Sequence, residues 1–262
     1  MSSSRISRRI FCTAFRASRL AAFLAGLLPA AAAAERAVDL ELVLAVDGSA
    51  SVDADEYALQ MRGIAAAFRD TDVVAALQSG PLGRIGVTLM TWSRTDRPKH
   101  AMPWRVLDSA ESAAAFADAV LARPRVTPAS GTGIGRAVQR AVWLIERNDM
   151  TAERRVIDVS GDGRETSFID YGVPPQQARQ QAMAHGITVN GLAILADEPD
   201  LDAYYRAHVI GGPGAFVMKA ARFEDFAAAM RRKLIREIEY RPRVSQARPP
   251  AISPAMSDGA NR

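Results

Sequence analysis

Residues 40–51 read LELVLAVDGSAS and decide the fold class. The seven residues before the aspartate are apolar except for one glutamate, a composition typical of a strand buried on both faces of a parallel sheet. We expect this strand over residues 38–46. The loop that follows carries side-chain oxygens at alternate positions, on Asp47, Ser49 and Ser51. Such a loop is either a turn with a helix-capping serine or a set of ligands for a metal ion.

Beyond this loop, short apolar segments alternate with amphipathic segments of helical length, which is typical of a parallel sheet covered by helices. Residues 84–92 and 100–107 flank a charged, proline-containing turn and predict a hairpin. The expected fold class is therefore α/β: a doubly wound, mostly parallel central sheet with one antiparallel edge strand and helices on both faces. We expect further strands at 154–160, 187–195 and 215–220, and helices at 53–68, 109–123, 134–147, 174–186, 201–210 and 223–239.

The first 34 residues differ in composition from the rest. They contain five arginines and no acid, and end in the apolar stretch LAAFLAGLLPAAAAA. A basic start, a short apolar middle and an Ala-x-Ala exit predict a signal peptide cleaved after Ala34, and hence a periplasmic or secreted bacterial protein. SRRIF at residues 7–11 resembles a twin-arginine signal, and a general secretory leader is the alternative. An uncleaved anchor is a further alternative, although Pro29 interrupts the stretch, which is short for a membrane span.

Removal of this leader would change the charge and the cysteine content. The chain has 33 basic and 29 acidic residues; without the five leader arginines, 28 basic residues face 29 acidic ones, a net charge of −1. The basic character of the whole chain therefore does not indicate a nucleic-acid partner. The only cysteine, Cys12, also lies in the leader, so a mature chain has no disulfide or thiolate metal site. Residues 241–262 are proline-rich and polar and predict a disordered tail behind a single domain at residues 35–240.

Two more loops carry candidate oxygen ligands. Residues 130–133, Ser-Gly-Thr-Gly, precede a predicted helix, and residues 160–163, Ser-Gly-Asp-Gly, follow a predicted strand. Each alone is typical of a turn or a helix cap. In a doubly wound sheet, however, loops at the carboxyl ends of neighbouring strands meet in a crevice where the strand order reverses. Thr132 and Asp162 would then join the first loop in an all-oxygen set, which suits Mg²⁺ or Mn²⁺.

The three segments resemble the metal-ion-dependent adhesion site of von Willebrand factor A-like domains, in which a threonine and an aspartate join an Asp-x-Ser-x-Ser loop. The order of strands and helices agrees over nearly all of residues 38–240, so the resemblance implies a von Willebrand A or Rossmann-like fold. More narrowly, residues 92–107, 130–138 and 156–163 are similar to a family of secreted bacterial A-like proteins known only as a domain of unknown function. One departure is Gly161, which stands where better-known members have an apolar residue or threonine.

The resemblance implies a role for each candidate ligand. Ser49 and Ser51 would bind the cation directly, and Thr132 directly or through water. Asp47 and Asp162 would act mostly through water or by orienting the other ligands. One coordination position would stay free for an Asp or Glu carboxylate of a protein partner. The expected function is an exported, metal-dependent protein-binding module that is not an enzyme. The alternatives are a periplasmic assembly or maturation factor and, less favoured, a metal-dependent phosphohydrolase.

Other chemistries fit the sequence less well. The glycines of residues 131–135 follow no strand directly, and no GxxxxGK[ST] motif exists, which argues against a nucleotide site. None of the three histidines accompanies a GxSxG motif, which argues against a serine hydrolase. A phosphohydrolase would need a carboxylate nucleophile or a second metal, whereas Ser49 occupies the paired position.

Three secondary expectations concern residues outside these loops. The tryptophans Trp92, Trp104 and Trp143 are expected in the core because of their spacing within strands and a helix. The basic cluster Arg231, Arg232, Lys233 and Arg236 is expected to be a solvated helix end, where cations suit the helix dipole. Asp158 is expected either to support the metal ligands or to be hydrogen-bonded in the core.

Overall fold

We describe the chain from a computed structural model, which covers residues 36–94, 100–125, 131–166 and 172–240. The predicted signal peptide at residues 1–34 and the predicted tail at residues 241–262 lie outside these ranges, as does Ser130. In the ranges described, no helix combines the length and the apolar character needed to cross a membrane.

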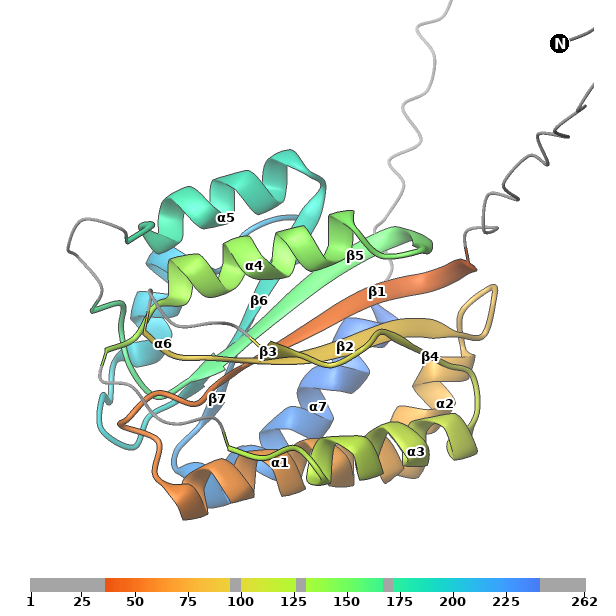
Figure 1. Cartoon of the computed structure of the whole chain (residues 1–262), viewed down its shortest axis with the longest axis horizontal. Coiled ribbons are helices and arrows are strands. Elements are labelled where there is room, and N and C mark those ends of the chain that lie inside the picture. The colour runs from red at the N-terminus through yellow and green to blue at the C-terminus, as the bar shows by residue number, and fades with distance from the viewer. Residues whose placement is uncertain (1–35, 95–99, 126–130, 167–171, 241–262) are drawn as a thin grey trace, which may run out of the picture. The chain divides into compact units, whose positions relative to one another are not determined.

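A seven-stranded sheet forms the centre of the described part of the chain, in the order β3-β2-β1-β5-β6-β7, with β4 also paired to β2 (Figure 1). All strands are parallel except β3 and β4, which pair antiparallel with β2. The expected mostly parallel sheet with an antiparallel edge is thus confirmed, with the edge divided into two short strands. The strands are β1 (Arg36–Asp47), β2 (Ile85–Trp92), β3 (His100–Ala101), β4 (Arg105–Leu107), β5 (Met150–Gly161), β6 (Ile187–Ile194) and β7 (Val217–Ala220).

Helices cover both faces of this sheet (Figure 1). The helices α4, α5 and α6 lie on one face, and α1, α2, α3 and α7 lie on the other. The bounds are α1 (Ala54–Arg69), α2 (Thr71–Gln78), α3 (Ala110–Leu121), α4 (Ile134–Glu146), α5 (Pro175–Ala184), α6 (Leu201–Tyr204), a π-helical turn (Tyr205–Val209), a 3₁₀ turn (Phe223–Asp225) and α7 (Phe226–Glu239).

Local sequence explains where most of these helices begin and end. Asp53 caps α1 in a capping box with Glu56, through two hydrogen bonds of 2.8 Å. Pro175 opens α5, and Gly186 follows its end with a φ of 69° that glycine adopts without strain. Helix α4 differs, because Gly133 at its N-cap has no side chain to accept a hydrogen bond from the first turn.

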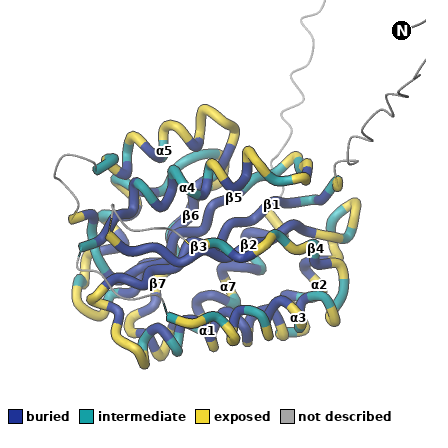
Figure 2. Tube along the Cα trace, in the orientation of Figure 1, coloured by how far each residue is buried: buried dark blue, intermediate teal, exposed yellow. Residues whose placement is uncertain are grey.

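The strand predicted from LELVLAV is buried on both sides, as its composition requires (Figure 2). Leu42 and Leu44 pack in the apolar cluster beneath α1, α3 and α7, and Val43 and Ala45 pack in the cluster beneath α4 and α5. Two apolar layers therefore hold β1 in the middle of the domain, with β2 on one side and β5 on the other.

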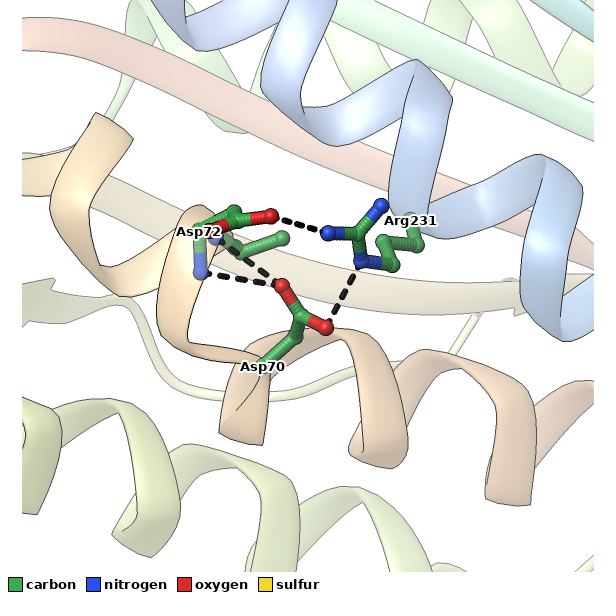
Figure 3. Close-up of polar contacts among 4 residues, drawn as sticks. Asp70, Asp72 and Arg231 are labelled. Atoms are coloured by element: carbon green, nitrogen blue, oxygen red, sulfur yellow. Dashed lines mark hydrogen bonds and ion pairs between the residues drawn. The ribbon is translucent and has the colours of Figure 1, made fainter.

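The last helix, α7, is attached to the rest of the domain by ion pairs. The guanidinium of Arg231 donates to Asp70 Oδ2 at 2.7 Å and also contacts Asp72 at the start of α2 (Figure 3). Lys233 is 0% exposed, with its Nζ 2.8 Å from Asp158 Oδ1 and paired with Glu237. The expectation of a solvated cluster is therefore wrong for Lys233. The helical repeat places it on the buried face of α7, where the Asp158 and Glu237 carboxylates compensate its charge.

The tryptophans divide between core and surface. Trp92 is buried, and Trp104 is half-buried against the core. Trp143 is 44% exposed, and its ring lies between Arg140 and Arg147, with guanidinium carbons 3.9 and 5.4 Å from the ring centroid. The prediction that Trp143 belongs to the core is wrong. It lies on the outer face of α4, where the guanidinium groups of Arg140 and Arg147 lie near its ring.

Candidate metal centre

The predicted ligand loops meet at one end of the sheet, where the strand order reverses. The strands β1 and β5 are neighbours, although the chain passes through β2, β3 and β4 between them. Asp47 is the last residue of β1, and Asp162 directly follows the last residue of β5. Thr132 precedes the first turn of α4. The chain passes from β1 to α1 on one face of the sheet and from β5 to α5 on the other, which is the arrangement at which ligands bind in doubly wound folds.

The side chains of the first and third loops are in direct contact. Ser49 Oγ lies 3.1 Å from Ser51 Oγ, and Ser51 Oγ donates a hydrogen bond of 3.0 Å to Asp162 Oδ1. Thr132 Oγ1 lies beside the third loop, 3.7 Å from the position that a Cβ on Gly163 would take. All five predicted residues therefore gather at one place. Ser51 is exposed there, and the other four are buried.

Asp47 is fully buried, with an exposed fraction of 0%. Its Oδ1 accepts a hydrogen bond of 2.8 Å from the amide of Ser49, and its main-chain oxygen accepts one of 3.1 Å from Gln60. Among the residues described, Asp47 Oδ2 has no hydrogen-bond partner. A buried carboxylate oxygen without a donor is costly, and a bound cation or its water would satisfy it.

Two residues that follow Asp162 in the chain, Glu165 and Thr166, hold the loop of Thr132 in place. The amide of Thr132 donates to Thr166 Oγ1 at 2.7 Å, and the amide of Thr166 donates to the Thr132 carbonyl oxygen at 3.0 Å. The neighbouring side chain, Glu165, is buried, and its Oε2 accepts the amide hydrogen of Gly135 at 2.9 Å. Glu165 thus supplies the cap that Gly133 cannot. No local motif links residue 132 to residue 166, so these roles could not be predicted from the sequence.

The electrostatics of the site favour a cation. Burial and, after it, the negative charge of Asp162 raise the pKa of Asp47 to about 8, although hydrogen bonds from Ser49 and from the Asp162 amide act in the opposite direction. Burial also raises the pKa of Asp162, against the hydrogen bond from Ser51. Two buried carboxylates of like charge resist ionising together, and a divalent cation between their loops would remove that resistance.

The donor set fits a hard cation. It consists of three hydroxyls and two carboxylates, without nitrogen or sulfur, which matches the preference of Mg²⁺ and Mn²⁺ for oxygen. In the ranges that the structure covers, no three His, Cys, Asp or Glu side chains surround a common metal position. The carboxylates are therefore few, and neutral hydroxyls make up most of the set.

Asp158 does not belong to this set. It points to the face of the sheet covered by α7, where Lys233 lies 2.8 Å away. Of the two alternatives expected for Asp158, the structure shows a polar contact inside the core, and the contact is an ion pair. Two of the histidines also have other contacts, since His185 lies 3.5 Å from Glu146 and His208 contacts Gln176.

Solved structures with this fold include proteins from bacterial pili. The pilus adhesin SpaC from Lactobacillus rhamnosus GG is 13% identical, with a TM-score of 0.55, over 77% of this chain and 31% of that one. The von Willebrand factor domain of the type V pili tip protein Mfa5 from Porphyromonas gingivalis is 11% identical, with a TM-score of 0.51, over 75% of this chain and 94% of that one.

A third similar structure is proximal thread matrix protein 1 from the mussel byssus, whose metal-ion-dependent adhesion site is occupied by zinc. It is 14% identical, with a TM-score of 0.51, over 79% of this chain and 50% of that one. This chain therefore spans half or less of the pilus adhesin and of the mussel protein. At these identities the likeness establishes the fold, which is that of von Willebrand factor A domains.

At the level of sequence, no curated protein matches the chain significantly. A family model does match it, over residues 37–242, which are nearly all of the described domain. The chain belongs to the family described as protein of unknown function (DUF1194).

Proposed function

We propose that this chain is a metal-dependent protein-binding module. A divalent cation, Mg²⁺ or Mn²⁺, would be held by the hydroxyls of Ser49, Ser51 and Thr132. Asp47 and Asp162 would orient these ligands or bind through water. The observation that carries the proposal is the meeting of three oxygen-bearing loops beside the buried Asp47, whose Oδ2 has no hydrogen-bond partner among the residues described.

The composition of the site favours binding over catalysis. A cation held mostly by neutral hydroxyls keeps much of its positive charge, so it attracts a carboxylate from outside. A partner that offers an Asp or Glu side chain would complete the coordination. Hydrolysis of a phosphate ester would instead call for a second metal or for a carboxylate free to act as nucleophile. Asp47, the carboxylate of the first loop, is buried and bonded to the amide of Ser49.

The similar structures support this function without identifying the partner. One is a pilus adhesin, one a pili tip domain, and one carries zinc in its metal-ion-dependent adhesion site. We propose a comparable role outside the cytoplasm for this chain, after removal of residues 1–34 as a signal peptide. Residues 35–240 would then form the binding domain, and residues 241–262 a flexible tail. A role in assembling or maturing a periplasmic complex is one form that such binding could take.

Thermal melting with and without metal tests the proposal. A cation that binds only the folded state stabilises it by about 2.7 kcal/mol at 100 times its dissociation constant. We expect the melting temperature to rise with Mg²⁺ or Mn²⁺ concentration and to fall in EDTA. The Ser49→Ala variant should lose most of this response, because it removes a direct ligand.

The matched control is Ser112→Ala, which removes a hydroxyl from the cap of α3. It should lower the melting temperature in EDTA and in metal by the same amount. Equal melting of the unmodified chain in EDTA and in millimolar Mg²⁺ and Mn²⁺ would contradict the proposal. Capture of a carboxylate-bearing partner from periplasmic extract, with and without EDTA, then addresses binding itself.

A further inference from the structure

We propose that Tyr205 is a positioning residue of this metal centre, whose hydroxyl orients the carboxylate of Asp47. The inference rests on the function proposed above and adds a residue that lies outside all three ligand loops. Tyr205 is the first residue of the π-helical turn that follows α6 in the chain. Such turns are rare in proteins and occur often at functional sites.

Two glycines make room for the Tyr205 side chain on the sheet. A Cβ on Gly191 of β6 would stand 2.6 Å from Tyr205 Cδ1, and a Cβ on Gly161 at the end of β5 would stand 3.0 Å from the Tyr205 hydroxyl. Real Cβ atoms essentially never approach another atom as closely as 2.6 Å, and a contact of 3.0 Å is tighter than most real Cβ contacts. The ring therefore lies against β6, and the hydroxyl reaches the end of β5, where the candidate ligands gather.

The hydroxyl and the Asp47 carboxylate both lie close to Gly161. The Cβ position of Gly161 lies 2.8 Å from Asp47 Oδ2 and 3.0 Å from the Tyr205 oxygen. The two oxygens are thus at most about 6 Å apart. A direct O–H···O bond needs about 2.7 Å, and one bridging water spans about 5.5 Å. The two oxygens are not directly bonded, since neither has a hydrogen-bond partner among the described residues, so the link that this geometry allows is a single bridging water.

Both atoms need a partner. Tyr205 and Asp47 are each 0% exposed, and neither the Tyr205 hydroxyl nor Asp47 Oδ2 has a hydrogen-bond partner among the residues described. One is a donor and the other is an acceptor. Burial, and then the negative charges of Asp47 and Asp162, hold the pKa of Tyr205 well above its usual value, so the hydroxyl keeps its proton. A donor fixed on Oδ2 would leave the carboxylate one orientation towards the cation.

This arrangement also accounts for Gly161, at which the third loop departs from better-known adhesion sites. A side chain there would meet Asp47 Oδ2 and the Tyr205 hydroxyl at once. Glycine and tyrosine at these two positions therefore depend on each other. We expect the pair to act as one unit in this chain.

The test compares Tyr205→Phe with the unmodified chain by titration with Mn²⁺, following free Mn²⁺ by electron paramagnetic resonance. The substitution removes one oxygen and keeps the ring in its slot. Loss of an outer contact of this kind lowers metal affinity by about 10-fold or more. The melting temperature in EDTA should stay close to that of the unmodified chain, because the hydroxyl has no other partner in the described structure.

The matched control is Tyr57→Phe. Tyr57 is also buried, and its hydroxyl also lacks a hydrogen-bond partner among the described residues, but it faces the charges of Arg123 and Arg125. It should leave Mn²⁺ affinity unchanged. A second variant, Gly161→Ala, keeps the tyrosine but places a methyl group against Asp47 Oδ2, and it should weaken Mn²⁺ binding at least as much as Tyr205→Phe.

Each outcome has one meaning. Weaker Mn²⁺ binding in Tyr205→Phe, with unchanged melting in EDTA, supports the positioning role. Unchanged affinity in Tyr205→Phe, when the unmodified chain binds Mn²⁺, overturns that role and leaves the proposed function standing. Failure of the unmodified chain to bind Mn²⁺ or Mg²⁺ overturns both.

Discussion

Replacement of Lys233 by methionine should destabilise this domain strongly, although the residue lies far from any proposed ligand in sequence. Lys233 is 0% exposed, and its Nζ contacts two carboxylates that are themselves buried, Asp158 and Glu237. Its cation also lies 5.1 Å from the ring centroid of Phe216. Methionine has a similar volume and packs without a cavity, so the main effect is electrostatic.

The expected loss is about 3 to 5 kcal/mol, the usual cost of removing one partner from a buried ion pair. For a domain of this size, this corresponds to a fall of roughly 10 °C in melting temperature. The double variant Lys233→Met/Asp158→Asn should recover part of the loss, because it leaves one buried carboxylate in place of two. Arg232→Met, at an exposed position on the same helix, is the matched control and should change the melting temperature by no more than about 2 °C.

The deficit should depend on pH in a defined direction. Burial raises the pKa of Asp158, and the pKa stands at about 7 even though the charge of Lys233 lowers it. A carboxyl whose folded pKa exceeds its unfolded pKa of 3.8 stabilises the fold most below about pH 4, and this contribution is lost as the pH rises to 7. Without Lys233 the folded pKa rises further. The deficit of Lys233→Met should therefore be smaller at pH 5 than at pH 8.

Thermal and urea melts at pH 5 and pH 8 measure these differences directly. The reasoning is refuted if Lys233→Met and Arg232→Met melt within about 2 °C of each other at both pH values. It is also refuted if the deficit of Lys233→Met is larger at pH 5 than at pH 8, since protonation of Asp158 must reduce the cost of an uncompensated charge.

Two further predictions concern residues whose roles appear only in the fold. Thr166→Val removes the hydroxyl that accepts the Thr132 amide hydrogen, so it should reduce the rise in melting temperature caused by Mg²⁺. Thr166→Ser keeps a hydroxyl and should restore that rise. Equal responses to Mg²⁺ in the two variants would count against a role of Thr166 in holding Thr132. Trp143→Ala should lower the free energy of unfolding, measured in urea melts, by less than about 1 kcal/mol because the ring is largely at the surface. Trp92→Ala should lower it by about 3 to 5 kcal/mol because Trp92 is buried in the core. Similar losses for the two tryptophans would contradict the burial that separates them.

Sequence patterns predicted the strands of the sheet well, because the period of the apolar residues and the local composition depend only on residues that are close together in the chain. The run before Asp47 had to be a two-sided buried strand, and β1 extends over Arg36–Asp47. The antiparallel pairing of residues 84–92 with residues 100–107 was predicted correctly, although residues 100–107 form two short strands, β3 and β4, and not one. The family resemblance to von Willebrand factor A domains agrees with the fold that the structure shows.

The predictions that failed concerned which face of a helix is buried and which is exposed. Four basic residues at the end of a helix resemble a solvated cluster, yet Lys233 faces inward. Its burial depends on Asp158, 75 positions earlier in the chain, which supplies the opposite charge. A tryptophan at helical spacing resembles a core residue, yet Trp143 points outward between two arginines. The burial of Lys233 was determined by a neighbour distant in sequence. The exposure of Trp143 was determined by the lack of a covering layer over the outer face of α4.

Residue type and spacing were enough to predict the alternation of strands and helices, the three polar loops and the chemistry of their oxygens. These properties follow from residue type and spacing, which need no partner to be defined. The folded structure was needed to show that Thr166 holds Thr132, that Glu165 caps α4, and that the Tyr205 hydroxyl and the Asp47 carboxylate both lie close to Gly161. Each of these contacts joins different segments of the chain, and it exists because the parallel strands bring their carboxyl ends to one edge of the sheet.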